Sequence, residues 1–127
     1  MGWFNKIPES EQKRQRLEQV FAGREPLDDQ QFWKTYFARY GVTLETTVRI
    51  RKVLTEILEA DLSRIRDTDD FSKELALFWD FDSMANVELV QALEDEFDIT
   101  ITNGEAETMK TLKDIVLGVH AKITKPE

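Results

Sequence analysis

The sequence contains no cysteine and only one histidine among its 127 residues. The lack of cysteine excludes a disulfide framework, a thiolate zinc site and a cysteine nucleophile. A single imidazole cannot form a two-histidine metal site or a histidine relay, so hydrolysis by a nucleophile or a metal is not expected. We therefore predict no catalytic residues and no metal site.

Basic residues and long apolar runs are also scarce. There are 17 Lys and Arg against 25 Asp and Glu, for a formal net charge of -8. A phosphate backbone is bound through Lys and Arg, so nucleic acid is not an expected partner. No stretch approaches the roughly 20 apolar residues of a membrane span, and no signal peptide is evident. We expect a cytoplasmic protein with no membrane span.

The negative charge is concentrated in one part of the chain. Residues 1–45 hold seven acidic and seven basic side chains, so the whole net charge falls on residues 46–127. Within residues 80–107 there are nine acidic side chains and no Lys or Arg. This distribution predicts one strongly negative surface.

Two helices are predicted within residues 1–45. The first spans residues 9–22, and Gly23 and Pro26 end it. The second is capped by Asp28 or Asp29 and ends at Gly41. It carries a stripe of aromatic residues: Phe32, Trp33, Tyr36, Phe37 and Tyr40. We interpret this stripe as a surface that packs on the following domain or on a second copy of the chain, with a ligand or partner groove as the alternative.

Residues 46–124 have the apolar spacing of further helices. We predict a helix from Thr46 to near Asp61, another over residues 84–97, a short one over residues 105–109 and a last one capped by Thr111. The loop after the first of these has four inward-pointing anchors: Leu62, Ile65, Phe71 and Leu75. Residues 99–102 form an extended connector, because an isolated strand would have no partner.

Ser83 follows Asp82 at the start of the helix predicted over residues 84–97. The first turn of a helix offers unpaired N–H groups and the positive end of the helix dipole, so a phosphate on this serine would be stabilised. The simpler interpretation is an N-cap, in which Asp82 or Ser83 accepts a hydrogen bond from the next turn.

The stretch from Asp82 to Ile101 resembles acyl carrier proteins, in which an Asp-Ser-Leu motif opens the second helix. The positions that match the family pattern without a gap are Val87, Glu88, Leu89, Val90, Ala92, Leu93, Glu94, Glu96, Phe97 and Asp98. The resemblance covers about residues 46–124. It implies an all-α fold: a four-helix bundle like that of acyl carrier proteins, preceded by a helical N-terminal extension over residues 1–45 and followed by a tail at 125–127.

The resemblance also implies a function. Ser83, beside Asp82, would receive a 4'-phosphopantetheine arm from coenzyme A through a phosphopantetheinyl transferase. The arm would hold acyl groups as thioesters and carry them between enzymes of fatty acid or specialised, polyketide-like metabolism, so the protein would be a carrier and not an enzyme. Acyl-transferring and condensing enzymes with basic patches would dock on the second helix. The expected docking residues are Met84, Val87, Glu88, Gln91, Glu94 and Asp95.

Several positions depart from the family pattern. Asp80, three residues before Ser83, stands where Gly is usual, and four additional residues lie between Leu75 and Ser83. Ala85 replaces a frequent acid and Gln91 a frequent apolar residue. A peptidyl carrier is a near variant, but it usually has paired glycines before the serine.

Two alternatives remain, one on function and one on oligomeric state. An unmodified, acidic helical interaction module would result if residues 77–81 blocked the serine. We expect a monomer, with dimerisation through the aromatic stripe as the alternative.

Overall fold

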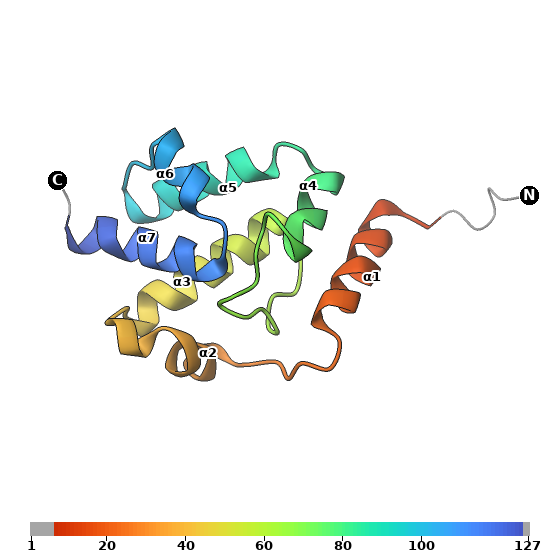
Figure 1. Cartoon of the computed structure of the whole chain (residues 1–127), viewed down its shortest axis with the longest axis horizontal. Helices are drawn as coiled ribbons and strands as arrows, with labels where there is room; N and C mark the ends of the chain where they lie inside the picture. Colours follow the sequence, from red (N-terminus) through yellow and green to blue (C-terminus); the bar gives the residue numbers. More distant parts are fainter. Residues whose placement is uncertain (1–6, 126–127) are drawn as a thin grey trace, which may run out of the picture.

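The computed structural model describes residues 7–125, which form a helical bundle (Figure 1). Its α-helices are α1 (Glu9–Phe21), α2 (Asp29–Tyr36), α3 (Leu44–Leu58), α4 (Leu77–Phe81), α5 (Ala85–Phe97), α6 (Asn103–Thr108) and α7 (Leu112–Thr124). Two short 3-10 turns, η2 (Ala38–Tyr40) and η3 (Glu74–Ala76), precede α3 and α4. Within the described residues the β structure is limited to one isolated bridge, Asp70 to Thr111. The predicted all-α fold is confirmed; residues 126 and 127 of the predicted tail lie outside the described part.

Side-chain caps explain where several helices begin. At α7, the Thr111 hydroxyl accepts from the Asp114 N–H at 3.0 Å, and the Asp114 carboxylate accepts from the Thr111 N–H at 3.1 Å. The same reciprocal arrangement occurs at two other starts, Asp28 with Gln31 and Thr102 with Glu105. These bonds satisfy N–H groups that the first helical turn leaves free. The caps predicted at Asp28 and Thr111 are confirmed.

Helix α3 begins earlier than predicted. Thr43 is its N-cap, and its hydroxyl accepts from the Thr46 N–H at 3.0 Å. The apolar repeat used for the prediction starts only at Val48, so it could not locate this cap. The predicted boundary between residues 45 and 46 therefore falls inside the first turn of α3.

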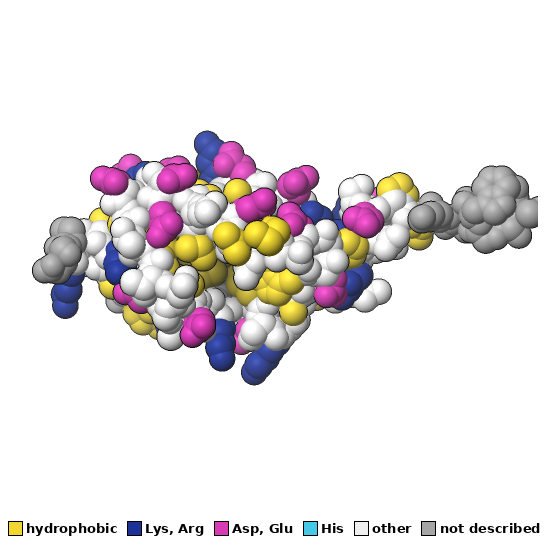
Figure 2. Space-filling model, turned by 90° about the horizontal axis from the view of Figure 1, so that it is seen from above, with side chains coloured by type: hydrophobic (Ala, Val, Ile, Leu, Met, Phe, Trp, Pro, Cys, Tyr) yellow, Lys and Arg dark blue, Asp and Glu magenta, His cyan; other side chains and the backbone are white. Residues whose placement is uncertain are grey.

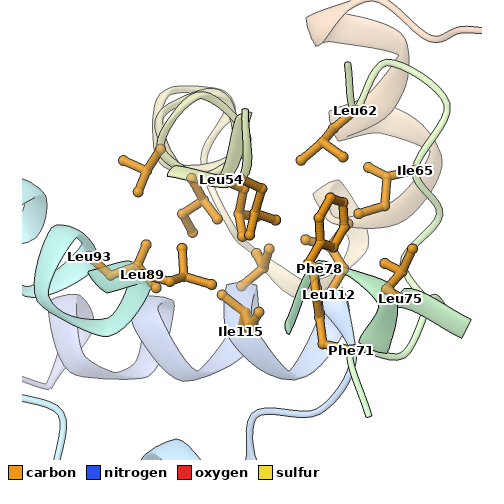
Figure 3. Close-up of a cluster of buried hydrophobic side chains, with 14 of the residues drawn as sticks. Leu54, Leu62, Ile65, Phe71, Leu75, Phe78, Leu89, Leu93, Leu112 and Ile115 are labelled. Atoms are coloured by element: carbon orange, nitrogen blue, oxygen red, sulfur yellow. The ribbon is translucent and has the colours of Figure 1, made fainter. Parts of the chain in front are cut away.

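The core lies between α3, α5 and α7 (Figure 3). Fully buried side chains come from these helices and from the loop after α3, including Leu54, Leu62, Ile65, Leu75, Leu93, Leu112 and Val116, and also from residues 21–42 of the extension. The four loop anchors predicted from the sequence, Phe71 among them, are all buried. Burial of each such side chain contributes about 1.5–3 kcal/mol to folding.

The loop between α3 and α4 is fastened to the start of α7. The Phe71 N–H donates to the Lys110 carbonyl at 2.7 Å, and the Leu112 N–H donates to the Asp69 carbonyl at 3.1 Å. Asp69 is itself 2% exposed. Its carboxylate accepts from both outer nitrogens of Arg24, at 2.7 and 3.0 Å, and from the Arg66 N–H at 2.8 Å. A residue of the N-terminal extension thus closes a buried ion pair inside this loop.

The aromatic stripe of the extension packs on the rest of the chain. Phe32 and Phe37 are 1% and 0% exposed and belong to the common core. The Trp33 indole N–H donates to the Val42 carbonyl at 2.6 Å, and the Arg51 guanidinium lies 4.2 Å from the centre of the Phe32 ring. The prediction that this stripe packs on the following domain is confirmed, and its two innermost rings are not available to a second copy.

Residues 77–81 form α4, a helix that the sequence analysis did not predict. Leu77 and Phe78 are buried, and the Trp79 indole N–H donates to the Phe71 carbonyl at 2.9 Å. Helix α1 lies beside α4 (Figure 1). The additional segment before the serine therefore packs into the core.

No helix within residues 7–125 is long and apolar enough to cross a membrane.

Candidate functional site

Ser83 lies on the turn between α4 and α5. Ser83 and its neighbours Asp82 and Met84 are all exposed, whereas Ala85, the first residue of α5, is 3% exposed. Asp82 stabilises the turn by accepting two hydrogen bonds, one at its side chain and one at its backbone carbonyl. Its Oδ1 accepts from the Met84 N–H at 3.0 Å, and its carbonyl accepts from the Ala85 N–H at 3.1 Å. Ser83 is thus presented on the surface by a turn anchored at both ends.

The N-cap interpretation of this segment is only partly met. Asp82 does accept from an N–H two residues on, but α5 itself has Met84 at its N-cap and, among the residues described, no side-chain cap hydrogen bond. The Ser83 hydroxyl is therefore not committed as a helix cap. An exposed hydroxyl next to the start of a 13-residue helix is placed where a phosphate would be stabilised by the helix dipole.

The outer face of α5 runs away from Ser83. Five of the six predicted docking side chains are exposed along it: Met84, Val87, Glu88, Gln91 and Asp95. Met84 and Val87 are 55% and 43% exposed, so two apolar groups lie among acids. Seen from above, this side of the molecule shows hydrophobic and acidic side chains next to one another (Figure 2).

Glu94 differs from the other predicted docking residues. It is half-buried, and its Oε2 accepts from the Ile101 N–H at 2.8 Å. Helical spacing placed it on the outer face, but the connector after α5 folds back to meet it. This bond occupies one carboxylate oxygen and fixes the connector in its extended form.

Basic residues from other elements pair with part of the acidic segment. Three of its nine acids form ion pairs: Asp80 with Arg16 at 3.0 Å, Glu96 with Arg49 at 2.7 Å and Glu105 with Lys122 at 2.7 Å. The hydrogen bond from Lys122 lowers the pKa of the Glu105 carboxyl below its usual value. The sequence showed no basic residue within this segment, and these partners are distant in the chain. These ion pairs neutralise part of the negative surface, whereas Asp82 and Glu88 lie exposed near Ser83 and Asp95, Asp98 and Glu107 lie exposed farther along the chain.

A small apolar cavity of about 110 Å³ lies between α4, α5, α6 and α7. It is lined by Phe71, Trp79, Asn86, Leu89, Val90, Leu93, Ala106, Met109 and Ile115. The Met109 methyl group lies 2.6 Å from the point where a Cβ on residue 118 would be. The absence of a side chain at Gly118 therefore leaves room for the Met109 side chain.

The family model described as "Phosphopantetheine attachment site" matches residues 48–117, more than half of the chain. The chain belongs to this family of phosphopantetheine-binding carriers. Three curated relatives support the assignment, each named acyl carrier protein. Those from Phenylobacterium zucineum and Caulobacter vibrioides are 37% identical over 75 residues (59% of this chain, 90% of that protein) and 41% identical over 68 residues (54% and 82%). The relative from Helicobacter hepaticus is 36% identical over 78 residues, covering 61% of this chain and 97% of that protein.

The resemblance to acyl carrier proteins is thereby confirmed. The protein is an acyl carrier and not an enzyme, and the group that its family carries is covalently attached 4'-phosphopantetheine. When attached, this group supplies a terminal thiol that forms thioesters. The residues of the carrier fit such a group, because an exposed hydroxyl stands on a turn with open space around it and a helix start beside it.

The family match starts at residue 48, after the N-terminal extension. The carrier therefore has two helices, α1 and α2, that precede the matched region and share one hydrophobic core with it.

Proposed function

We propose that Ser83 carries the phosphopantetheine arm of this acyl carrier and that residues 46–124 form the carrier unit, to which residues 1–45 add an extension. The observation that carries the assignment is the exposed Ser83 on the Asp82 turn at the start of α5. In the loading step the Ser83 oxygen would form a P–O bond to the phosphorus nearer pantetheine, the pyrophosphate P–O bond of coenzyme A would break, and adenosine 3',5'-bisphosphate would leave. The serine proton would pass to a base on the transferase.

The loaded carrier would shuttle acyl thioesters between enzymes of fatty acid or specialised, polyketide-like metabolism. The apolar cavity between α4 and α7 supports this role, since it offers an acyl chain a mostly apolar place beside α5. The extension favours a specialised pathway, because the curated relatives are matched over 82–97% of their own lengths by only 54–61% of this chain.

The loading experiment tests the assignment of Ser83. The protein is incubated with coenzyme A, magnesium and a broad-specificity phosphopantetheinyl transferase, and its intact mass is measured. We expect a gain of one phosphopantetheine, located by peptide mapping in the segment that contains Ser83. No gain with a cognate transferase, from a folded sample, would favour the unmodified interaction module instead. Within the structure, α4 packs inward and leaves Ser83 exposed, which favours the carrier.

The outer face of α5 is the proposed docking surface for the transferase and for acyl-transferring and condensing enzymes. Opposite charges on the carrier and its partner enzyme accelerate their association, and salt screens the attraction between exposed charges. We expect Glu88→Lys to lower kcat/KM for loading by roughly three- to tenfold at low ionic strength, with the difference shrinking as salt is added. The measurement is the rate of loading over a series of salt concentrations.

Glu45→Lys is the matched control for that variant. It makes the same change of charge on an exposed side chain at the start of α3, whose opposite end is the one near the Ser83 turn. An equal loss of rate in both variants would show that net charge, and not the face of α5, governs docking.

A further inference from the structure

A groove opens between α1 and the rest of the bundle, beside the turn that carries Ser83. Its volume is about 260 Å³, and it borders both Asp82 and Ala85, which lie before and after Ser83 and Met84 in the chain. Its other walls come from α1, the end of α3 and α4: Glu9, Ser10, Lys13, Ile57, Leu58, Glu59, Phe78 and Phe81. Figure 1 shows α1 beside α4, at the end of the bundle where the chain turns into α5.

A second hollow, of about 290 Å³, continues this groove along α1. The two share three lining residues, Ser10, Lys13 and Glu59, so they form one path, which we call the α1 groove. Its far part is lined by Leu17 and Phe21 among others. Both parts of the groove mix apolar and charged side chains. Near Ser83 the apolar ones are Ile57, Leu58, Phe78 and Phe81, and farther along α1 they are Leu17 and Phe21.

We propose that the α1 groove receives the phosphopantetheine arm, so that the N-terminal extension forms a resting place that shields the arm's thiol or thioester. This inference depends on the proposed attachment at Ser83. The arm has a phosphodiester at its base, amides, a hydroxyl and two methyl groups in its middle and a sulfur group at its end, and the groove presents apolar and hydrogen-bonding side chains along its length. Lys13 borders both parts of the groove and supplies a positive charge among the carboxylates of Glu9 and Glu59. Ser10 supplies a hydrogen-bonding hydroxyl, and Leu17 and Phe21 supply apolar contacts at the far end.

Lys13 is held in position for this contact. Its Nζ donates to the Leu58 carbonyl at 2.8 Å, at the end of α3. An ammonium group has three donors, so two remain for an anion or an amide carbonyl. The wall formed by α1 is itself fixed, because the Arg16 guanidinium meets the Asp80 carboxylate at 3.0 Å and lies 5.5 Å from the centre of the Phe81 ring.

The attachment makes weak contacts sufficient. A tethered group experiences its site at an effective concentration in the millimolar range, so binding that would be negligible between separate molecules becomes substantial within one. The arm could also leave the groove readily, as a carrier requires.

Thiol reactivity of the loaded protein tests the inference. Because the chain has no cysteine, the arm provides its only thiol. Loading is first verified by intact mass and free coenzyme A is removed. The rate of reaction with an aromatic disulfide that releases a coloured thiolate is then measured. We expect Ser10→Trp, which fills the groove, to raise the rate about threefold or more. An arm that occupies the groove at least about two-thirds of the time is exposed at most about one-third of the time, so its thiol is protected at least threefold.

Gln19→Trp is the matched control. Gln19 is also exposed on α1, and nine residues from Ser10, or about two and a half turns, it points to the opposite side of the helix. We expect it to leave the rate unchanged. Equal rates in the wild type and in Ser10→Trp, with full loading, would overturn the inference while leaving the attachment at Ser83 intact. Failure to load would overturn both.

A second measurement needs no substitution. Amide chemical shifts of the wild type before and after loading should differ at Ser10, Lys13 and Glu59 as well as around Ser83. Differences confined to residues 82–87 would show that the arm does not occupy the α1 groove.

Discussion

Ser83→Ala should abolish loading completely, so that the mass after incubation with coenzyme A and the transferase equals that of the starting protein. The substitution removes the only atom through which the proposed ester can form. It should leave the free energy of unfolding within about 0.5 kcal/mol of the wild type, because an exposed side chain that does not cap a helix contributes little. Intact mass and thermal unfolding of the same samples measure the two effects.

Ser72→Ala is the control for the loss of a serine. Ser72 is exposed like Ser83 but lies on the loop after α3, where its hydroxyl donates to Asp70 at 2.5 Å. This variant should load to the same extent as the wild type. A phosphopantetheine on Ser83→Ala, at any position, would refute the assignment of the attachment residue.

Asp69→Ala should have the largest effect on stability, a loss of about 3–5 kcal/mol in the free energy of unfolding. The Asp69 side chain is 3% exposed, and its carboxylate accepts hydrogen bonds from both outer nitrogens of Arg24, whose side chain is 14% exposed. Removing the carboxylate would leave a buried guanidinium without its counterion and the Arg66 N–H without its acceptor. The midpoint and slope of urea unfolding provide the measurement.

Glu18→Ala offers a comparison between ion pairs of different burial. Glu18 pairs with Arg64 across α1 and the loop after α3, but its side chain is 52% exposed. Exposed pairs contribute about 0–1 kcal/mol, so this variant should lose at most that amount. Similar losses in the two variants would show that burial of the Arg24–Asp69 pair does not determine its contribution.

The sequence was sufficient for those features that depend on neighbours in the chain. The apolar repeats located α1, α3, α5 and α7, and the Thr111 cap fixed the start of α7 to the residue. The position of Ser83 at the start of α5 also came from local pattern. Helix α4 was missed because five residues are too few to show a helical period, and its aromatic side chains have no polar face to alternate with.

Features that depend on distant contacts could not be predicted. The spacing along α5 placed Glu94 with the docking residues, but its partner is the backbone of Ile101, which reaches it only because the connector folds back. The ion pairs of the acidic segment and the α1 groove also depend on contacts between distant parts of the chain. They join residues of different elements, such as Ser10 with Glu59, and no local pattern encodes which faces meet.

The contact of Arg16 with α4 has an evolutionary consequence. Arg16 belongs to the extension, whereas Asp80 and Phe81 belong to α4, in the lengthened stretch before the serine, and the guanidinium lies against both. If either the extension or the lengthened stretch were absent, the surface of the other that is now covered by this contact would be exposed to solvent. We therefore expect carriers that have such an extension to have the lengthened stretch before the serine as well.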